Sequence, residues 1–433
     1  MRIIEADSPE FQKELHRITG RGETFDGKIM EVVGDVLHNV AVRGDKALFE
    51  YVARFDGITL DERTVALTAE EREDACRRVD PADMKILQLA AERIERFHRC
   101  QTINSWFTVD EEGTELGQLV RPLERVCVYA PGGRAPYPST VLMAAIPARV
   151  AGVEKIFLAT PEKAGGIDPL IVAAAGLSGV DQIFRIGGAQ AIAAFAYGTE
   201  SIPRVDKIVG PGNIYVAAAK RMVFGAVGID MIAGPSEIVI IADASAPAAY
   251  VAADLLSQAE HDELASAVLL TPEKEVARKV AAELKKQLRE LPRESIAALS
   301  LEGYGGIIVT RDMDEAINLA NTLAPEHLEL MVEYPREMLG KIKNAGAIFM
   351  GYRTPEAVGD YIAGPNHILP TAGTARFSSP LGVYDFVKRT SILSFSEASM
   401  ERLGGAVLRF ATLEGLDAHG RSVEKRIHEK EKK

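Results

Sequence analysis

The sequence predicts an α/β protein with two Rossmann-like parallel-sheet units and with helical N-terminal and C-terminal extensions. Three features lead to this prediction: residues 1–120 are patterned as helices, short β-rich runs then alternate with helical stretches, and the strand signal fades after residue 380. Such alternation is typical of parallel sheets covered by helices on both faces. A chain of 433 residues is also too long for one compact core, so we expect at least two domains.

The clearest helix of the N-terminal part is predicted to begin near residue 81. In the segment DPADMKILQLAAERIERFHRCQ, Asp80 is a candidate N-cap and Pro81 occupies the first helical position. Apolar side chains then recur at helical spacing, which predicts one buried face. They are Met84, Leu87, Ala91 and Ile94, and His98 follows in the same register.

Eight β-rich runs follow this helical part. The first four are RVCVYA, KIFLAT, QIFRIG and DKIVG, and the last four are EIVIIA, AVLLT, GIIVT and AIFMG. Helical stretches such as EKEVARKVAAELKKQLREL lie between them. We therefore expect two similar sheet units, one before and one after about residue 236. The final segment, RSVEKRIHEKEKK, is interpreted as a charged helix or a frayed tail.

Composition narrows the class of protein. The net charge of −12 argues against a nucleic-acid partner, which would favour a basic surface, and it does not favour binding to anionic membranes. The N-terminus lacks a signal-peptide pattern, and no apolar run reaches the ~18 residues that a membrane span needs. The three cysteines, Cys76, Cys100 and Cys127, show no motif spacing and indicate reduced thiols. We expect a soluble cytoplasmic protein.

Glycine-rich turns follow three of the predicted strands, in VCVYAPGGRAPYPST, FRIGGAQAIAAFA and KIVGPGNIYVAAAK. Ligands of open α/β sheets bind at the carboxyl ends of strands, where such turns bring backbone N–H groups near a phosphate. None of the turns has the G-x-G-x-x-G pattern, so each alone is equally compatible with a structural turn. Together they favour a nucleotide or another polar ligand. The side chains placed to contact it are Tyr129, Gln190 and Asn213.

The eight histidines fall into two groups. Four lie in helical, charged segments and are expected to be exposed or half-buried: His16, His38, His98 and His428. The other four each have a carboxylate or carboxamide nearby, in or beside a segment punctuated by Gly or Pro: His261, His327, His367 and His419. One such histidine is commonly a capped loop residue, whereas four together favour a shared site.

The segment LLSQAEHDE offers a pair of metal ligands. Gln258 and His261 are three residues apart and so share one helix face. The pair marks either a solvated helix end or half of a metal site. With Asp360 and His419 it would supply two imidazoles, one carboxylate and one amide oxygen, a set that suits a zinc-like ion. Spacing alone does not establish this set, because its parts are far apart in sequence.

Glu326 and His327 in LAPEHLEL are candidates for proton transfer. A histidine and a glutamate side by side can both point into one pocket, and imidazole titrates near neutrality, as a general base requires. The alternative is a helix that begins after Pro325, with Glu326 stabilised by the helix dipole.

These segments resemble the histidinol dehydrogenase family. The resemblance rests on LLSQAEH, APEHLEL, GDYIAGPNHILPT, GGAQAIAA, VDKIVGPGN, AGPSEIVIIAD and SSPLGVYDFVKRT, which occur in the family's order and spacing from about residue 20 to 420. Two departures, Ala324 where a glycine is frequent and the variable residues between Glu414 and His419, affect no functional side chain. The family oxidises L-histidinol to L-histidine through an aldehyde, with two NAD+ and one zinc ion.

The resemblance implies roles for individual residues. Gln258, His261, Asp360 and His419 match the zinc ligands, and Glu326 and His327 match the proton-transfer residues. The matching substrate positions are Ser236, Gln258, His261, His327, Asp360, His367, Glu414 and His419, and the matching NAD positions are Tyr129, Gln190 and Asn213. In the family the tail reaches the neighbouring subunit's site, which implies a homodimer with shared sites.

The implied domains are an N-terminal helical arm, a catalytic α/β domain, a second Rossmann-like domain and a C-terminal tail domain. Their expected borders are 1–25 for the arm, 26–130 with 237–380 for the catalytic domain, 131–236 for the second domain and 381–433 for the tail.

Three other classes compete with this interpretation. A zinc hydrolase would keep the metal site but would not need the glycine turns. A periplasmic-type binding protein would need a secretion signal. A generic aldehyde dehydrogenase would use a thiolate nucleophile. Cys127 is the only cysteine near a glycine turn, and it alternates with Val126 and Val128 in a predicted strand, so we expect it to be buried and to form no covalent intermediate.

Overall fold

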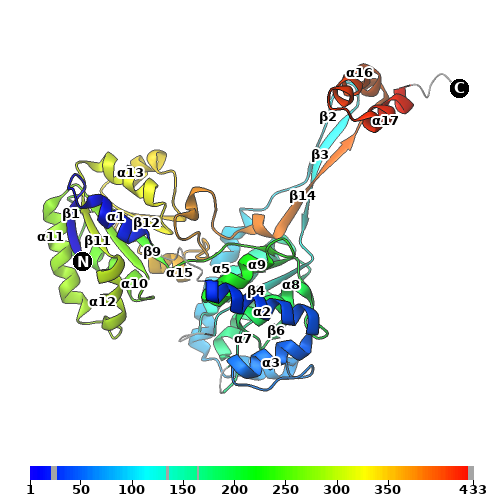
Figure 1. The fold of residues 1–433 in the computed structure, drawn as a ribbon. Coiled ribbons are helices and arrows are strands. Elements are labelled where there is room, and N and C mark those ends of the chain that lie inside the picture. Colours follow the sequence, from blue (N-terminus) through cyan, green and yellow to red (C-terminus); the bar gives the residue numbers. More distant parts are fainter. Residues whose placement is uncertain (21–26, 133–135, 163–164, 428–433) are drawn as a thin grey trace. The chain divides into compact units, whose positions relative to one another are not determined.

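The structure is a computed structural model that describes residues 1–20, 27–132, 136–162 and 165–427. It divides into two compact units. The first unit comprises Met1–Gln101 and Leu123–Phe386, and the second comprises Thr102–Pro122 and Val387–Lys433. Figure 1 shows the helices and strands of both units.

A five-stranded parallel sheet forms from the first four predicted strands and one short addition. Its order is β6-β5-β4-β7-β8. The strands are β4 (Arg125–Tyr129), β5 (Lys155–Ala159), β6 (Gln182–Phe184), β7 (Lys207–Val209) and β8 (Gly228–Ile229). Successive side chains of β4 enter opposite cores: Val126 and Val128 pack on one face, and Cys127 and Tyr129 pack on the other. The strand is therefore apolar throughout because helices cover both faces.

Helices on each face of this sheet complete the two cores. One core contains side chains of α4 (Ala69–Arg77), α5 (Pro81–Arg99), α6 (Pro138–Ala151) and α7 (Pro169–Ser178). The other contains side chains of α2 (Gly27–Arg43), α3 (Asp45–Phe55), α8 (Gly188–Tyr197) and α9 (Ile214–Val223). The helix predicted near residue 81 is confirmed, with the Asp80 side chain accepting the N–H of Ala82 and with Pro81 in the first turn.

A six-stranded parallel sheet contains the other four predicted strands and has the order β1-β11-β10-β9-β12-β13. The strands are β1 (Arg2–Glu5), β9 (Glu237–Ala242), β10 (Ser266–Thr271), β11 (Gly306–Val309), β12 (His327–Met331) and β13 (Ala347–Met350). One face packs on α10 (Ala248–Ala259), α11 (Lys274–Leu288) and α12 (Glu294–Tyr304), and the other packs on α1 (Phe11–Thr19) and α13 (Met313–Leu323). The remaining short helices are α14 (Pro335–Met338), η1 (Leu339–Lys341), α15 (Glu356–Tyr361), η2 (Thr374–Arg376) and η3 (Val383–Phe386).

The second unit is an antiparallel sheet followed by two helices. The sheet order is β14-β3-β2, with β2 (Trp106–Val109), β3 (Glu115–Pro122) and β14 (Val387–Ser394). The helices are α16 (Glu397–Leu413) and α17 (Asp417–Ile427), which pack on each other.

The predicted fold class, with its parallel sheets on either side of about residue 236, is confirmed. Several strands were not predicted. β12 replaces the alternative helix start after Pro325, and β1 adds an edge strand to the second sheet. β2, β3 and β14 form where only helices or a fading strand signal were expected, because their exposed antiparallel pairing leaves little apolar pattern.

The expected grouping of residues 26–130 with 237–380 differs from the observed pairing. β4 pairs with β5 and β7, and α2 to α5 pack on that same sheet. The four-part division of the chain otherwise stays a prediction.

His98 was expected to be exposed or half-buried, and this prediction is wrong. The side chain is fully buried on α5, and its Nδ1 atom lies 2.8 Å from the carbonyl oxygen of Ile94. His428 lies outside the described residues.

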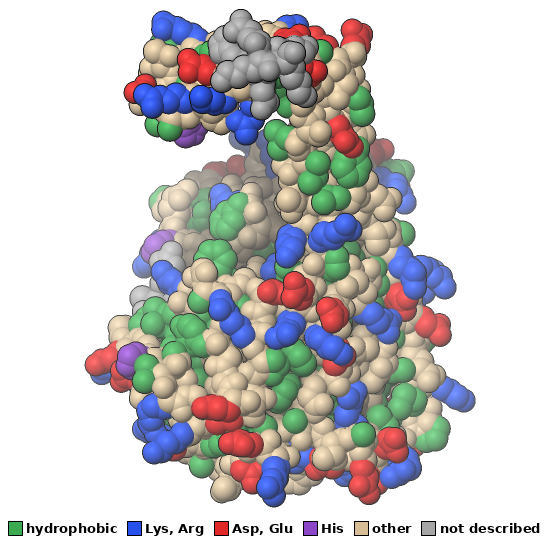
Figure 2. Space-filling view, turned by 90° about the vertical axis from the view of Figure 1, so that its right-hand side faces the viewer, with side chains coloured by type: hydrophobic (Ala, Val, Ile, Leu, Met, Phe, Trp, Pro, Cys, Tyr) green, Lys and Arg blue, Asp and Glu red, His purple; other side chains and the backbone are tan. Residues whose placement is uncertain are grey.

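The distribution of surface charge and the character of the helices concern possible partners. Figure 2 shows acidic and basic side chains interspersed on one face of the molecule. Among the described residues, no helix combines the length and apolar character that a membrane crossing requires.

Candidate active site

A pocket of about 190 Å³ in the first unit brings together both predicted proton-transfer residues and several of the predicted metal and substrate residues. Its lining includes the loop after β7 and residues near the amino ends of β9, β10 and β12, together with α15. The predicted residues among its lining are Ser236, His261, Glu326, His327, Asp360 and His367. Ligands were expected at carboxyl ends of strands. For the six-stranded sheet, the proton-transfer residues instead lie where β12 begins.

The hydrogen bonds of His327 determine its tautomer. This residue is buried at the start of β12, and its Nδ1 atom lies 3.1 Å from the backbone carbonyl oxygen of Glu237. Because a carbonyl oxygen only accepts, Nδ1 carries the ring proton. The Nε2 atom is then unprotonated, and it has no hydrogen-bond partner among the described residues. Burial lowers the pKa of His327 to about 3, so the ring is neutral at physiological pH and Nε2 can accept a proton.

Glu326 accepts a hydrogen bond from the first residue of β9, the strand next to β12. Its Oε2 atom accepts the backbone N–H of Glu237 at 3.0 Å, and the side chain is buried at the wall of the pocket. The beginning of β12 therefore presents both predicted proton-transfer residues to one cavity: His327 is the first residue of the strand, and Glu326 directly precedes it.

Gln258 connects the two histidines. Its Oε1 atom lies 3.1 Å from Nδ1 of His327, and its Nε2 atom lies 3.4 Å from Nδ1 of His261. Gln258 is fully buried near the end of α10, and His261 follows where the helix stops. The predicted pairing of Gln258 with His261 at a spacing of one turn is therefore present in the structure.

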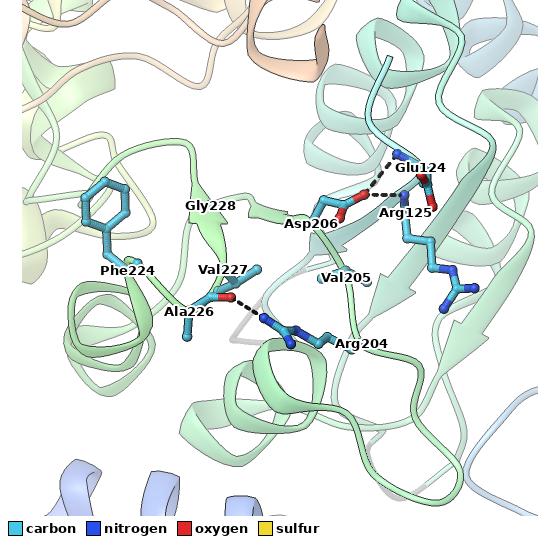
Figure 3. A pocket seen from close by; sticks show the side chains of 10 residues that line it. Glu124, Arg125, Arg204, Val205, Asp206, Phe224, Ala226, Val227 and Gly228 are labelled. Atoms are coloured by element: carbon cyan, nitrogen blue, oxygen red, sulfur yellow. Dashed lines mark hydrogen bonds between the residues drawn. The ribbon is translucent and has the colours of Figure 1, made fainter. Parts of the chain in front are cut away.

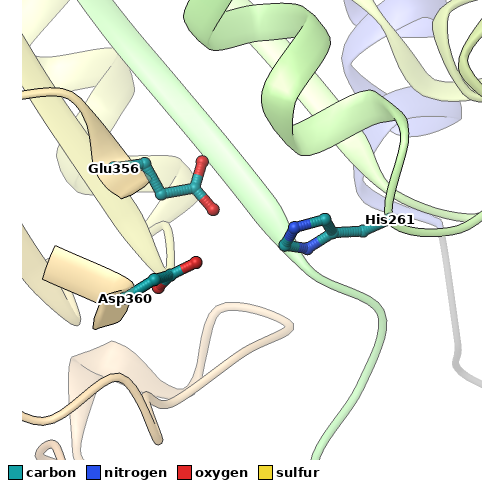
Figure 4. A group of neighbouring side chains, drawn as sticks. All are labelled: His261, Glu356 and Asp360. Atoms are coloured by element: carbon teal, nitrogen blue, oxygen red, sulfur yellow. The ribbon is translucent and has the colours of Figure 1, made fainter. Parts of the chain in front are cut away.

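Three side chains form a cluster that could hold a metal ion. One ligand atom each from His261, Glu356 and Asp360 lies within 4.8 Å of the other two. In Figure 4 the two carboxylates, from α15, point toward the ring of His261 from the opposite side. Asp360 belonged to the predicted ligand set, whereas Glu356 did not.

The burial and the partners of Glu356 and Asp360 indicate whether a cation fits this cluster. Neither carboxylate oxygen of Glu356 has a hydrogen-bond partner among the described residues, although both are buried. Burial, with Asp360 next, raises the pKa of Glu356 well above its ordinary value. Burial also raises the pKa of Asp360 to about 6. One imidazole and two carboxylates converge here, and no hydrogen-bond donor among the described residues offsets the burial of Glu356. Such a set of donors suits a zinc-like cation.

Two further acids, Asp254 and Glu329, interact electrostatically with Glu356. Burial, followed by the charge of Asp254, raises the pKa of Glu329 to about 9, and burial raises that of Asp254 to about 6. The Oε1 atom of Glu329 accepts the backbone N–H of Glu356 at 2.8 Å. This contact fixes the first turn of α15, the helix that carries Glu356 and Asp360.

His367 is oriented by a hydrogen bond to the backbone of α15. Its Nδ1 atom donates to the backbone carbonyl oxygen of Asp360 at 2.9 Å, which leaves Nε2 as an acceptor. Burial lowers the pKa of His367 to about 4. Ser236, on the chain segment just before β9, lines the same pocket.

A second cavity, of about 500 Å³, contains all three residues predicted to bind a cofactor. The hydroxyl of Tyr129 accepts the backbone N–H of Gly188 at 3.1 Å. Gln190 donates to Asp56 at 3.4 Å, and Asn213 caps α9 by accepting the N–H groups of Tyr215 and Val216. Within this sheet the cavity lies at the carboxyl ends of strands, as expected for an α/β protein.

The turn after β7 joins the two cavities. Gly210 and Pro211 line the smaller pocket, and Asn213 lines the larger cavity. Gly210 has φ +110°, and an added Cβ would lie 2.1 Å from the carbonyl oxygen of Tyr129, so only glycine fits. A buried ion pair between Lys220 and Asp230 holds the turn: Lys220 donates to the carbonyl of Gly210, and Asp230 accepts its N–H.

The remaining predicted residues, Glu414 and His419, belong to the second unit. Glu414 follows α16 and His419 is in the first turn of α17, and both side chains are exposed there. The first unit alone therefore does not assemble the full predicted ligand and substrate set.

Several residues of the site were not predicted from the sequence. Glu356, Glu329 and Asp254 are the main examples. A signal for Glu356 was present in TPEAVGDY, because Glu356 and Asp360 are four residues apart and share a helix face. Glu329 follows His327 by two residues on a strand, which places both on one side.

Two further features of the first unit, Cys127 and a depression near Asp206, have structural roles. Cys127 is fully buried, as predicted, and burial raises its thiol pKa well above the ordinary value. A wider depression of about 580 Å³ lies at the other end of the first sheet. There Asp206 accepts the N–H groups of Glu124 and Arg125, and Arg204 donates to the carbonyl of Ala226 (Figure 3). These polar groups thus tie loops together.

Comparison with known proteins gives one consistent result. The sequence model described as histidinol dehydrogenase matches residues 19–427. Histidinol dehydrogenase of Syntrophotalea carbinolica is 55% identical, with 99% of each chain covered, and that of Geobacter metallireducens is 54% identical, with 99% and 98% covered. A crystal structure of histidinol dehydrogenase from Elizabethkingia anophelis has a TM-score of 0.92 and 37% identity, covering 98% of this chain and 97% of the other.

Proposed function

The chain belongs to the histidinol dehydrogenase family of NAD-dependent oxidoreductases, and on this premise we propose that it oxidises L-histidinol to L-histidine through L-histidinaldehyde. Each of the two oxidations would transfer a hydride to one NAD+. The observation that carries this proposal is the unprotonated Nε2 atom of His327, fixed by the Nδ1 contact to a carbonyl oxygen, at the wall of a pocket next to a cofactor-sized cavity.

His327 is the proposed base of the first oxidation. Its neutral imidazole accepts the hydroxyl proton as the hydride leaves the alcohol carbon, and the cofactor supplies the hydride chemistry. Gln258 and the Glu237 carbonyl keep the ring in the required tautomer.

Glu326 is the proposed base of the second oxidation. Water must add to the aldehyde carbon before a second hydride can leave, and a carboxylate at the pocket wall can remove a proton from that water. The N–H of Glu237 fixes one oxygen of Glu326, which orients the carboxylate. Cys127 is buried in the core and does not serve as a nucleophile in this scheme.

A zinc ion is the proposed metal. Gln258, His261, Asp360 and His419 would hold it, and when bound it would supply a Lewis acid for the neutral imidazole and amine nitrogens of histidinol. The carboxylate of Glu356, which is buried without a hydrogen bond beside His261, supports a cation at this place. The proposed substrate-binding residues are Ser236, Gln258, His261, His327, Asp360, His367, Glu414 and His419.

Tyr129, Gln190 and Asn213 are the proposed NAD contacts, because all three line the larger cavity. The turn at Gly210 connects this cavity with the pocket of His327, which is the arrangement that hydride transfer between cofactor and substrate needs.

A homodimer with shared sites is also proposed. Support comes from the second unit, which holds Glu414 and His419 and exposes many large apolar side chains. Among them are Trp106, Phe107, Leu393, Phe410 and Leu413. A cytoplasmic location stays a prediction from the sequence.

The test of the function is the stoichiometry of NADH. Purified protein is mixed with L-histidinol and excess NAD+, and the absorbance of NADH is followed to completion before and after dialysis against a chelator. We expect two NADH per histidinol, a loss of activity after dialysis, and recovery with Zn2+. One NADH per histidinol would contradict the second step, and no NADH from zinc-loaded protein would overturn the function and revive the zinc-hydrolase alternative.

A further inference from the structure

Glu356 is an acidic residue of the pocket to which neither the proposed ligand set nor the proton-transfer scheme gives a role. Its exposed fraction is 1%, and it begins α15, one turn before Asp360. At this spacing the two carboxylates project from the same face of the helix. Figure 4 shows both pointing toward His261.

The carboxylate of Glu356 has no partner among the described residues that accounts for its burial. Both of its oxygens are buried without a hydrogen bond. Oε1 lies 3.7 Å from Nδ1 of His327, but that nitrogen already faces the Glu237 carbonyl and the Gln258 carboxamide. A buried carboxylate anion without a partner is costly, so such a group either stays protonated or has a cation beside it.

The distances in the cluster suit a shared ion. Ligand atoms of His261, Glu356 and Asp360 lie within 4.8 Å of one another. Ligands at ~2.1 Å from one four-coordinate zinc-like ion are ~3.4 Å apart. A shortening of each separation by about 1.4 Å or less would therefore bring all three donors to a common ion.

The backbone holds Glu356 in this position. Its N–H donates to Oε1 of Glu329 at 2.8 Å, and Pro355 precedes it at the N-cap of α15. The side chain thus starts from an anchored helix end and not from a loop.

We propose that Glu356 supplies a carboxylate ligand to the metal ion while no substrate is bound. This inference rests on the proposed function, whose metal centre it extends by one donor beyond Gln258, His261, Asp360 and His419. The carboxylate occupies coordination space that the imidazole and amine of histidinol take when the substrate binds.

The test measures the metal centre without histidinol. Full-length wild type, Glu356→Gln and the control Glu263→Gln are stripped of metal. Zn2+ affinity is then measured by competition with a chromophoric chelator, and the absorption spectrum is recorded with Co2+. Glu263 is a matched control because it is an exposed carboxylate two residues after His261. We expect Glu356→Gln to weaken Zn2+ binding by about tenfold to a hundredfold and to change the Co2+ spectrum, with the control within about twofold of wild type.

Two outcomes overturn the proposal. One is wild-type affinity in Glu356→Gln. The other is weaker binding with an unchanged Co2+ spectrum, which would mean that the charge acts through space. If Glu356→Gln does not fold, Glu356→Asp replaces it, because it keeps the charge but withdraws the carboxylate, and the same two readouts decide.

The NADH assay on wild type separates this proposal from the function. If wild type produces no NADH but Zn2+ binding depends on Glu356, the ligand role stands and the function fails. If wild type produces two NADH per histidinol and Glu356→Gln binds Zn2+ as wild type does, only the ligand role fails.

Discussion

The Oε1 atom of Gln258 lies 3.1 Å from the Nδ1 atom of His327, so one side chain of α10 contacts the proposed base directly. The carbonyl oxygen of Glu237 lies at the same distance from Nδ1. Two acceptors on one ring nitrogen require that nitrogen to be the donor, which leaves Nε2 to accept a proton. The helix that presents His261 therefore also sets the tautomer of His327.

We expect His327→Asn to lower kcat for histidinol oxidation by about 10²-fold to 10⁴-fold, the usual contribution of a general base. The Asn amide can still donate to the Glu237 carbonyl, so the free energy of unfolding is expected to change little. Steady-state kinetics and denaturant unfolding measure both quantities. His38→Asn, at an exposed histidine of α2, is the control. A variant with near wild-type kcat would rule out His327 as the base.

Asn213 has both a capping role and a proposed cofactor role, and two substitutions separate them. Asn213→Ala removes the cap of α9 and is expected to cost about 1 kcal/mol of stability and to raise the KM for NAD+. Asn213→Ser keeps a capping oxygen. If the KM for NAD+ rises in both variants, the side chain contacts the cofactor; if it rises only in Asn213→Ala, the residue acts through the helix end.

The larger part of the fold could be predicted because buried parallel strands leave a local signal. Runs such as EIVIIA are apolar throughout since helices cover both faces of the sheet, and their order along the chain follows from the alternation with helices. β14 left no such signal because its side chains face mostly outward in a three-stranded antiparallel sheet.

The candidate site could be predicted only in pieces. Gln258 and His261 are three residues apart at the end of α10, and their side chains meet there, so their spacing was informative. The contact of Gln258 with His327 was not predictable, because it depends on the parallel pairing of β12 with β9. Glu356 was missed for the same reason: its burial against His261 comes from tertiary packing, which no local pattern encodes.

The acidic pair Asp254 and Glu329 should make stability depend on pH. The pKa of Glu329 is raised to about 9 by burial and by Asp254, whereas an unfolded chain would titrate near its ordinary value of 4.5. Between these values the unfolded state binds fewer protons than the folded state, so the free energy of unfolding falls as pH rises.

Glu329→Gln imitates the protonated acid and should flatten this dependence. Its amide oxygen can still accept the N–H of Glu356. Between about pH 5 and 8.5, we expect metal-free wild type to lose ~1–3 kcal/mol more stability than the variant. Urea unfolding of metal-free protein at several pH values measures the difference. Parallel pH profiles for the two proteins would contradict the raised pKa.

The buried ion pair of Lys220 and Asp230 should be necessary for the turn at Gly210. The two side chains are only 3% and 1% exposed, and both bond to the backbone of Gly210. Lys220→Met leaves a buried carboxylate without its cation and is expected to destabilise the fold by ~3–5 kcal/mol. Adding Asp230→Asn should recover part of this loss. Equal stability of the single variant and wild type in urea unfolding would show that the pair is dispensable.

Mixed dimers can test whether the second unit serves the neighbouring subunit. His327 lies in the first unit and His419 in the second, so inactive variants at these positions damage different parts of a site. If His419 acts in the partner's site, a dimer of one His327→Asn chain and one His419→Ala chain has one site with both histidines intact. If His419 acts within its own chain, neither site of that dimer is intact.

The two variants are therefore mixed in equal amounts, dissociated, reassociated and assayed for NADH formation. Random pairing makes half of the dimers mixed, each with one of two sites intact, so sharing predicts recovery of about a quarter of wild-type activity. Each variant taken alone through the same procedure is the control. Mixed preparations as inactive as the separate variants would place His419 in the site of its own chain, and the exposed apolar side chains of the second unit would then need a different partner.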